Sequence, residues 1–490
     1  MHNKPDSSEH NSTLGGLIWK FGERITAQLV STVVTIILAR LLTPSDYGVV
    51  ALVTIFITIC NTLVTGGLGN ALIQKKDADE TDFSSMFYFS AFMSIILYFV
   101  MFFMAVPIAK FYNKPQLIPI IRVMSLRLPF AAANSIQQAF ISRRMQFRKF
   151  FVATIIGTII SAVVGIYMAY KGYGPWALVM QYLTNVFIDT FVLFLVGGWR
   201  PKFLFSIGRV KGMLPYGLRI MGASLLDTVF NEIRSIVISA KYSDVDLAMY
   251  ENGKKYPNLI VTNINSSITS VMLPVLSKKQ NDTLQIKATM KKSIKVSVYL
   301  LAPLLLGFLV CADRFVDVIL TDKWADCVPY ICLMCVMCLF YPIHTINIQA
   351  VNAVGRSDLT LRLEVIKKIF NIVVLIITML LGVFWIAFGA LVVSLASTYI
   401  NAAYSKKLFN YSFAEQIFDI IPSLLLSLIM GLAVFAFDRL VVLDSTFMLI
   451  ADVMIGAFVY LVASVILKPE PFKIITEEFK HFTKRFNKRV

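Results

Sequence analysis

Residues 16–30 read GLIWKFGERITAQLV, an apolar segment that contains a charged pair, Glu23 and Arg24. The meaning of this pair depends on the solvent around the segment. The 490 residues of the chain are 57% hydrophobic and only 15% charged, with a mean hydropathy of +0.72. Soluble domains are about 45–50% apolar and about 25% charged. The excess of apolar residues therefore predicts a chain that lies mostly in lipid.

Apolar runs separated by basic or Gly/Pro turns predict fourteen membrane-spanning helices. A helix of about 20 apolar residues spans the hydrocarbon core of a bilayer. The eighth predicted span is the weakest, because Glu251, Lys254 and Lys255 interrupt it. The approximate positions are 17–42, 47–66, 83–109, 117–140, 150–170, 176–196, 213–240, 247–276, 293–320, 327–354, 363–384, 386–404, 417–437 and 447–467. The expected fold class is an all-α polytopic membrane protein.

The positive charges predict the orientation of these spans. Of the 46 Lys and Arg, 30 lie in the N-terminal tail, the even-numbered turns and the C-terminal tail, and only 8 lie in the odd-numbered turns. Lys and Arg are retained on the cytoplasmic side, so both termini are expected in the cytoplasm. The net charge of +17 then reflects this retention and not a nucleic-acid partner. The polar N-terminus lacks the basic-then-apolar order of a cleavable signal peptide, so the first span is expected to remain.

Two short similarities predict an internal duplication. GERITAQLV (22–30) resembles GLRIMGASL (217–225), which aligns Arg24 with Arg219 at an offset of 195 residues. TPSDYGVVAL (43–52) resembles KYSDVDLAMY (241–250), with the Ser-Asp pair offset by 198. Transporters are often built from such repeats. Six spans separate the copies, so the repeats are expected to be parallel, and the last two spans fall outside them.

The predicted organisation follows from the repeat. It comprises two pseudo-symmetric six-helix bundles, a linker and two further helices. The expected parts are a cytoplasmic N-tail (1–13), a first bundle (14–196), a cytoplasmic linker (197–212), a second bundle (213–408), helices 13 and 14 (409–467) and a basic cytoplasmic C-tail (468–490). The C-tail places Phe and Ile at helical spacing among basic residues, which is typical of an amphipathic helix on anionic lipid.

An ordered series of segments resembles the Wzx-type polysaccharide flippases, which share a superfamily with the multidrug and toxic compound extrusion (MATE) antiporters and the lipid II flippases. In the first half these segments are ARLLTPSDYGVVAL (39–52), GLGNALIQKKD (67–77), QQAFISRRMQFRKF (137–150), GYGPWALVMQYL (172–183) and GGWRPKFLFS (197–206). The second half adds YPNLIVTNINSSITSVMLPVLSK (256–278) and INIQAVNAVGRSDL (346–359). One departure from the family pattern is MYENGKKYPN (249–258), where an Arg is expected after the Tyr.

The resemblance implies a V-shaped pair of six-helix bundles around a central cavity. It also implies a substrate, an oligosaccharide repeat unit on an undecaprenyl pyrophosphate carrier, which moves from the cytoplasmic to the outer leaflet. The implied partners are this lipid-linked oligosaccharide, membrane lipids, and possible pathway neighbours, a polysaccharide polymerase and glycosyltransferases. The implied location is the cytoplasmic (inner) membrane, where the chain would serve O-antigen, capsule or exopolysaccharide biosynthesis.

Charged residues within predicted spans are candidates for the substrate site, because a charge in the membrane usually faces a cavity or a partner. Arg presents a planar fork suited to phosphate oxygens. The candidate substrate-binding residues are Arg24, Arg219, Arg234, Arg127, Arg122 and Glu23. In this interpretation Arg24 and Arg219 approach the pyrophosphate from repeat-related walls, and Glu23 balances Arg24 when the site is empty. Asp189 and Asp452 are weaker intramembrane candidates.

Each candidate also has a structural interpretation. Trp19 and Lys20 resemble interfacial residues, which would leave Glu23 and Arg24 in the headgroup layer. Arg234 could pair with Glu232 or Asp227 as a structural ion pair. Arg122 and Arg127 are five residues apart, about 140° around a helix. At most one of these two is therefore expected to face a cavity squarely.

No motif in the sequence indicates a cofactor, a metal site or a catalytic residue. The run CVPYICLMCVMC (327–338) resembles a zinc or iron–sulfur motif, but thiols three residues apart on one helix cannot surround a metal. The sequence also has no GxxxxGK[ST] phosphate loop, so ATP hydrolysis is not expected. Two alternatives stay open: a cation-coupled multidrug antiporter, which favours acidic or apolar cavity walls, and a membrane glycosyltransferase or polymerase, which usually carries a long external loop.

Overall fold

The computed structural model describes residues 26, 28, 30–441 and 444–487, and in this part of the chain every regular element is helical. The chain divides into two compact units, residues 1–248 and 249–490. A helix over Val30–Leu41 precedes the numbered elements. Unit 1 contains α2 (Pro44–Thr65), α3 (Leu68–Gln74), α4 (Glu80–Phe111), α5 (Leu117–Met124), α6 (Arg127–Arg143), α7 (Phe147–Tyr170), α8 (Pro175–Val196) and α9 (Ile207–Lys241).

Unit 2 begins within α10 (Asp244–Ser277) and includes the remaining helices. These are α11 (Thr283–Val310), α12 (Ala312–Phe315), α13 (Val328–Cys338), α14 (Tyr341–Ala353), α15 (Ser357–Thr378), α16 (Val383–Phe409), α17 (Phe413–Leu440), α18 (Ser445–Leu467) and α19 (Glu470–Asn487). A π-helical turn (Val316–Leu320) and a 3₁₀ turn (Asp322–Cys327) join α12 to α13. The division falls after α9, whereas the sequence pattern placed the linker before this helix, at 197–212.

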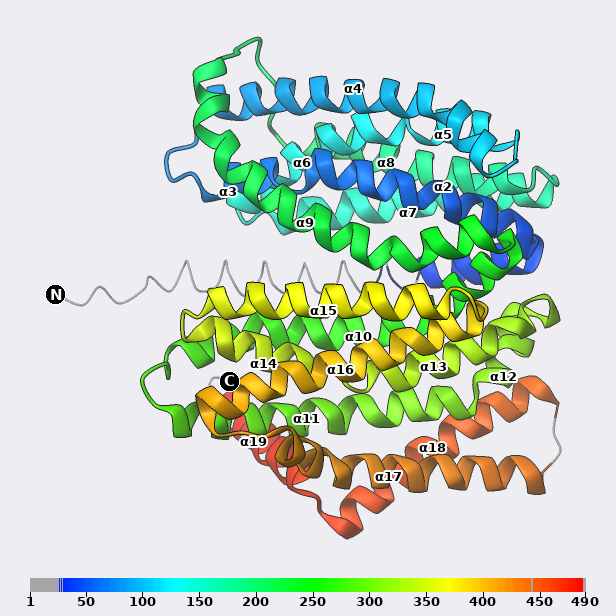
Figure 1. Ribbon diagram of the computed structural model, residues 1–490, viewed down its shortest axis with the longest axis vertical. Coiled ribbons are helices and arrows are strands. Elements are labelled where there is room, and N and C mark those ends of the chain that lie inside the picture. The colour runs from blue at the N-terminus through cyan, green and yellow to red at the C-terminus, as the bar shows by residue number, and fades with distance from the viewer. Residues whose placement is uncertain (1–25, 27, 29, 442–443, 488–490) are drawn as a thin grey trace. The chain divides into compact units, whose positions relative to one another are not determined.

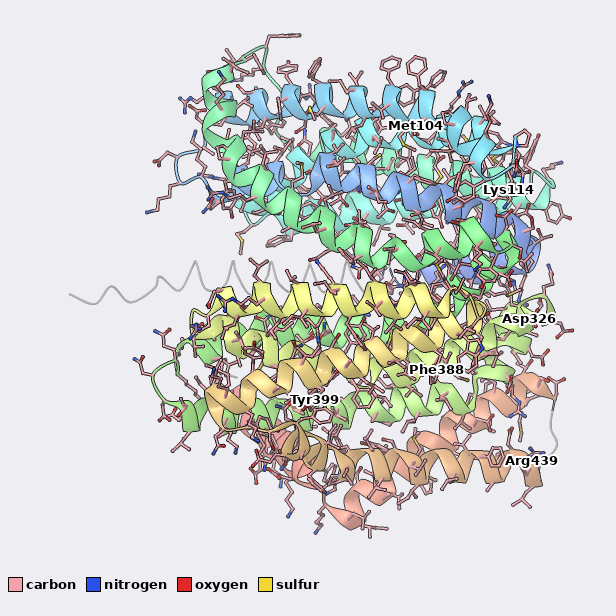
Figure 2. The ribbon with its side chains drawn as sticks, in the orientation of Figure 1. Met104, Lys114, Asp326, Phe388, Tyr399 and Arg439 are labelled. Atoms are coloured by element: carbon pink, nitrogen blue, oxygen red, sulfur yellow. The ribbon has the colours of Figure 1, made fainter. Side chains whose placement is uncertain are left out.

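The helices are apolar on the outside. On α4 the exposed residues Phe92, Phe99 and Phe103 alternate with buried serines such as Ser90 and Ser94. The same inversion recurs in unit 2, where α16 exposes Phe388 and Tyr399 (Figure 2) and buries Ser397 and Thr398. Small and polar residues pack between helices in membranes because lipid is already apolar. The surface pattern is therefore that of a multi-pass membrane protein, as the composition predicted.

Eleven helical segments among the described residues are long and apolar enough to cross a membrane. Three further predicted spans correspond to the helix that includes Val30–Leu41, to α9 and to α15. The last two carry several charged residues, which lowers their mean hydropathy. The all-α polytopic fold is confirmed.

The second of the two sequence similarities, between residues 43–52 and 241–250, corresponds to a repeated structure, but the two segments align at a different offset. Thr43 and Asp46 form a capping box at the start of α2, with Thr43 Oγ1 accepting from the Asp46 N–H at 3.2 Å. Ser243 and Asp246 form the equivalent box at the start of α10, at 3.1 Å. The equivalent caps are 200 residues apart, whereas the sequence similarity aligned the Ser-Asp pairs at an offset of 198. The N-cap, and not the Ser-Asp pair, is the repeated feature.

Two predicted spans in corresponding halves are broken in the middle. Span 4 is interrupted at Ser125 and Leu126, between α5 and α6, and span 10 is interrupted at Leu339 and Phe340, between α13 and α14. Irregular backbone within a membrane persists only where protein or a water-filled cavity satisfies the freed peptide groups. Interrupted spans at matching positions in two halves are the best structural pointer to a transport site.

The C-terminal helix α19 is amphipathic and packs on unit 2. Phe472 and Ile475 contact a buried cluster formed by Tyr299, Leu426, Met430 and Tyr460. Glu470 forms an ion pair with Lys295 of α11, which also lies 3.3 Å from Asp419 of α17. The helical spacing predicted for the C-tail is confirmed. The sequence pattern suggested that the apolar face of this helix lies on lipid, whereas part of that face contacts protein.

Candidate functional site

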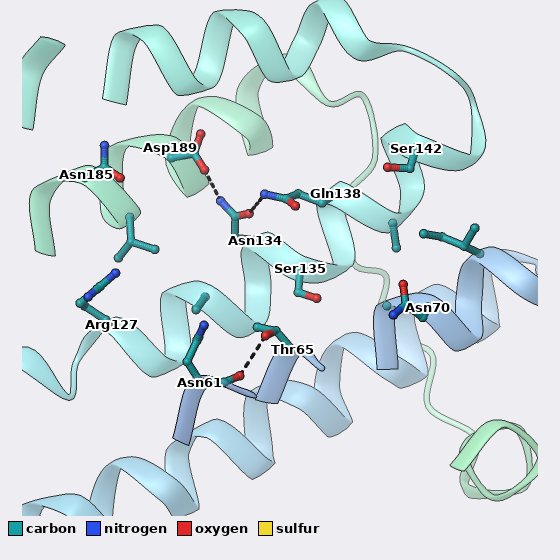
Figure 3. A pocket seen from close by; sticks show the side chains of 15 residues that line it. Asn61, Thr65, Asn70, Arg127, Asn134, Ser135, Gln138, Ser142, Asn185 and Asp189 are labelled. Atoms are coloured by element: carbon teal, nitrogen blue, oxygen red, sulfur yellow. Dashed lines mark hydrogen bonds between the residues drawn. The ribbon is translucent and has the colours of Figure 1, made fainter. Parts of the chain in front are cut away.

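A polar cavity of about 540 Å³ lies in unit 1, between the α2–α3 break, α6 and α8 (Figure 3). Within a predominantly apolar fold, its walls carry amides, hydroxyls, one Arg and one Asp. Its volume falls within the range of small-molecule sites, about 300–1,000 Å³. The residues that line it are Asn61, Thr65, Gly69, Asn70, Ile73, Arg127, Ala131, Asn134, Ser135, Gln138, Ala139, Ser142, Asn185, Val186 and Asp189.

Arg127 is the first residue of α6, directly after the break in its span. Its guanidinium lies 5.5 Å from the ring centroid of Tyr182, and within the described part of the chain its buried Nε has no hydrogen-bond partner. Arg127 therefore places a positive charge at one end of the cavity, which favours an anionic ligand group.

A chain of hydrogen bonds occupies the wall formed by α6 and α8 (Figure 3). Asn134 Nδ2 donates to Asp189 Oδ2 at 2.6 Å, and Gln138 Nε2 donates to Asn134 Oδ1 at 2.6 Å. The other carboxylate oxygen, Asp189 Oδ1, is buried and has no hydrogen-bond partner among the described residues. Burying such a group without a partner is costly. The open acceptor is therefore a strong candidate for ligand contact.

The two helices that carry this wall are held together locally. Thr190 Oγ1 of α8 lies 2.6 Å from Val186 O and 3.2 Å from Phe130 O of α6. Phe130 and Phe187 make an edge-to-face contact with ring centroids 5.1 Å apart. At the cavity itself, a Cβ at Gly69 would lie 3.1 Å from Ser135 Oγ, which shows how closely α3 approaches α6. These contacts fix the positions of the cavity side chains.

The other sequence candidates lie away from this cavity or outside the described residues. Arg122 packs on Phe102, with its guanidinium 4.2 Å from the ring centroid and Nε donating to Phe102 O at 3.4 Å. Arg219 is exposed on α9, and Arg234 is half-buried on the same helix and makes an interaction of its own. Glu23 and Arg24 lie outside the described residues. Of the four candidates that the structure describes, Arg127 is the one that lines the cavity.

Sequence reasoning missed the amide lining. Asn134 and Gln138, like Asn185 and Asp189, are four residues apart and therefore share a helix face. Such polar pairs within apolar helices indicate a polar site in the membrane, and the sequence contains them. Pro129, close to the interruption of span 4, is a second indication in the sequence. Asp189 is among the weaker candidates of the sequence analysis. The packing of α6 against α8 in the folded protein brings Asn134 and Gln138 close to Asp189.

Within the described residues there is no group of three or more His, Cys, Asp or Glu arranged to hold a metal ion. The six cysteines are free, and Cys332, Cys335 and Cys338 lie along α13. The site therefore consists of hydrogen-bonding groups and two charges. Its polar lining is suited to binding a polar ligand.

Residues 37–329, which include every cavity residue, match the family model described as "Polysaccharide biosynthesis protein". The chain belongs to the polysaccharide biosynthesis protein family. The resemblance to Wzx-type flippases found in the sequence is thus confirmed at the level of the family.

Three related proteins are similar to this chain over 60–87% of its length. The lipopolysaccharide biosynthesis protein WzxC of Escherichia coli is 21% identical over 438 residues, 87% of this chain and 89% of that protein. The succinoglycan biosynthesis transport protein ExoT of Rhizobium meliloti is 24% identical over 298 residues. This match spans 61% of the chain and 60% of ExoT. The teichuronic acid biosynthesis protein TuaB of Bacillus subtilis is 22% identical over 298 residues, 60% of this chain and 61% of that protein.

Solved structures identify the fold of this family member. The lipid II flippase MurJ in an inward closed conformation superposes with a TM-score of 0.73, covering 93% of this chain and 99% of that one at 16% identity. A multidrug resistance MATE family transporter in an inward-facing conformation gives a TM-score of 0.62 at 13% identity, covering 80% of this chain and 98% of that one. At these identities the likeness concerns the fold alone.

Proposed function

We propose that the protein is a flippase for undecaprenyl-pyrophosphate-linked oligosaccharide repeat units, which it moves across the cytoplasmic membrane by alternating access. The repeat units would serve O-antigen, capsule or exopolysaccharide biosynthesis. The family match, the transport and biosynthesis names of the relatives, and the MurJ-like fold support this proposal. We also propose that the protein carries substrate without chemical conversion, a proposal supported by the transport name of ExoT and by the flippase fold.

The observation that carries the proposal is Arg127 with its open Nε in a polar cavity inside an apolar fold. A pyrophosphate has two or more negative charges, and placing a bare charge in hydrocarbon costs far more than a few kcal/mol. A flippase must therefore offer fixed positive groups and hydrogen bonds within the membrane. Arg127, at the N-terminus of α6, supplies both, while the polyprenyl tail remains in lipid.

The remaining candidate residues have secondary roles in this proposal. Arg219, which lies away from this cavity, and its repeat-related counterpart Arg24 would contact the pyrophosphate at another stage of its transfer, and Glu23 would balance Arg24 in the empty state. Arg234 and Arg122 would contribute positive potential, with Arg122 held by its contact with Phe102. We further propose that both termini are cytoplasmic and that a polymerase and glycosyltransferases act with the protein. The cytoplasmic assignment rests on the Lys and Arg bias.

Reconstitution tests the proposal. Purified protein is placed in liposomes that contain undecaprenyl-pyrophosphoryl-N-acetylglucosamine, and galactosyltransferase with UDP-galactose is added outside. Protein-free liposomes allow modification of the outer-leaflet pool only, whereas a flippase exposes the whole pool. Modification limited to the outer pool would contradict the proposal. Extrusion of ethidium driven by a cation gradient, without lipid movement, would favour the multidrug antiporter.

A further inference from the structure

Arg127 and Asp189 line the same cavity, yet they form no ion pair with each other in the structure. Opposite charges in a low-dielectric site attract strongly. Their separation means that each charge is available to a different part of one ligand. From this we infer that the wall of Asp189, Asn134 and Gln138 binds the sugar next to the pyrophosphate. This inference rests on the proposed function, and it names the sugar hydroxyls as the group that the wall recognises.

The hydrogen-bonding groups of the wall suit a sugar. The Asn134 amide holds Asp189 Oδ2 at 2.6 Å and leaves Asp189 Oδ1 as an open acceptor inside the protein. Asn134 is itself held by Gln138, and only 5% of its surface is exposed. A sugar hydroxyl can donate to Oδ1 while its oxygen accepts from a neighbouring amide or hydroxyl. A site built to hydrogen-bond an OH group strongly rejects ligands that lack it.

The wall is also rigid before any ligand binds. Thr190, which is 5% exposed, bridges α8 to the backbone of α6, and Asn134 Nδ2 lies 3.3 Å from its Oγ1. At Gly157 of α7, a Cβ would lie 3.3 Å from both Asn185 O and Asp189 N, so α8 is packed closely on its other side as well. Binding then needs little ordering of side chains, which favours affinity and selectivity.

Distances along α6 set the order of the two subsites. Asn134 follows Arg127 by seven residues, which corresponds to roughly 10 Å along a helix axis. The cavity volume of about 540 Å³ lies in the usual range for small-molecule sites, about 300–1,000 Å³. This size suits a pyrophosphate and the sugar attached to it better than a long oligosaccharide. The wall would therefore read the proximal sugar, whereas the rest of the repeat unit lies beyond the cavity.

Binding to the full chain in nanodiscs tests this inference with two probes: undecaprenyl pyrophosphate alone, and undecaprenyl pyrophosphate carrying glucose, galactose or N-acetylglucosamine. We expect the wild type to bind at least one sugar-bearing lipid about tenfold more tightly than the bare carrier, the scale of one charge-assisted hydrogen bond. D189N, which preserves the shape of the side chain, should abolish this preference and leave affinity for the bare carrier unchanged. R127A should weaken the binding of both probes.

Controls separate the possible failures. D358N removes an exposed carboxylate outside the cavity and should retain the sugar preference. Asn185→Ala removes a lining amide without breaking the Asp189–Asn134–Gln138 chain, and it should reduce the preference only partly. An unchanged preference in D189N overturns the inference and leaves the proposed function standing. Wild-type protein that binds neither probe overturns the proposed function, and the inference with it.

Discussion

Arg314 Nη1 lies 2.6 Å from Oδ2 of Asp452, and the same nitrogen also contacts Asp438. Arg314 belongs to the short helix α12, whereas the two carboxylates belong to α18 and α17. Asp452 is only 2% exposed, although it lies on a helix whose other faces are strongly apolar. One guanidinium therefore neutralises a buried carboxylate and connects three helices of unit 2.

Removal of this guanidinium should destabilise unit 2. Breaking a buried pair costs about 3–5 kcal/mol when one charge is left uncompensated, and partial exposure of Arg314 should reduce this figure. We expect R314A to lower the midpoint of thermal unfolding in detergent by several degrees, with R314K intermediate. Arg439, exposed near the end of α17, provides the matched control, and R439A should leave the midpoint almost unchanged. Equal midpoints for R314A and R439A would contradict this account.

Substitution of Arg127 should reduce lipid translocation without unfolding the protein. A hydrogen bond to a charged group contributes about 1.5–3 kcal/mol, so we expect R127A to slow translocation by roughly tenfold or more. R127K keeps the charge but loses the planar fork and should be intermediate. Arg439 is the control, because it is exposed at the end of α17 and does not line the cavity. An equal loss in R439A would show that positive charge in general, and not this position, determines the rate.

The pair Arg24 and Arg219 can be tested through surface polysaccharide. If both contact the pyrophosphate, single Ala variants should reduce export, and Lys variants should reduce it less, since a point charge replaces a bidentate fork. The measurement is surface polysaccharide, normalised to the amount of protein in the membrane. Wild-type export from both Ala variants would remove these two residues from the substrate site and leave Arg127 as its cationic group.

Gly48 should tolerate no side chain. A Cβ at this position of α2 would lie 1.9 Å from the backbone oxygen of Asp244, at the start of α10. Backbone atoms cannot move aside as a flexible side chain can, so we expect G48A to lower the thermal midpoint clearly. Gly222 on α9 has no atom within 4 Å of an added Cβ. G222A should therefore be neutral or stabilising by up to about 1 kcal/mol, because Ala favours helix.

The docking of α19 gives a prediction for the C-tail. Phe472 packs on the buried cluster that includes Tyr299 and Tyr460, so F472D places a charge against apolar side chains. We expect a lower thermal midpoint and faster proteolysis of the C-tail in F472D. Lys473 is exposed on the same turn, and K473S should behave as the wild type. Identical protease sensitivity in both variants would show that α19 does not depend on this contact.

The sequence alone contained the fold class, because hydropathy and chain length act on each helix independently of its neighbours. The Lys and Arg bias predicted an orientation, and the Gly/Pro pattern placed most turns correctly. The repeat was recognisable, although its register was off by two residues, since the sequence showed a Ser-Asp pair where the structure repeats an N-cap. Asn134, Gln138 and Asp189 were visible as polar residues in apolar helices, but nothing in the sequence indicated that they meet.

Only the tertiary structure decided which polar residues share a cavity. Arg122 and Arg127 have similar sequence contexts, yet the break before α6 turns Arg127 toward α8, while Arg122 remains on α5 against Phe102. The packing of α6 on α8 brings Asn134 to Asp189 across 55 positions of the chain. The physical reason is that partition into lipid is a sum over single residues, whereas a binding site depends on the directions and distances between side chains of different helices.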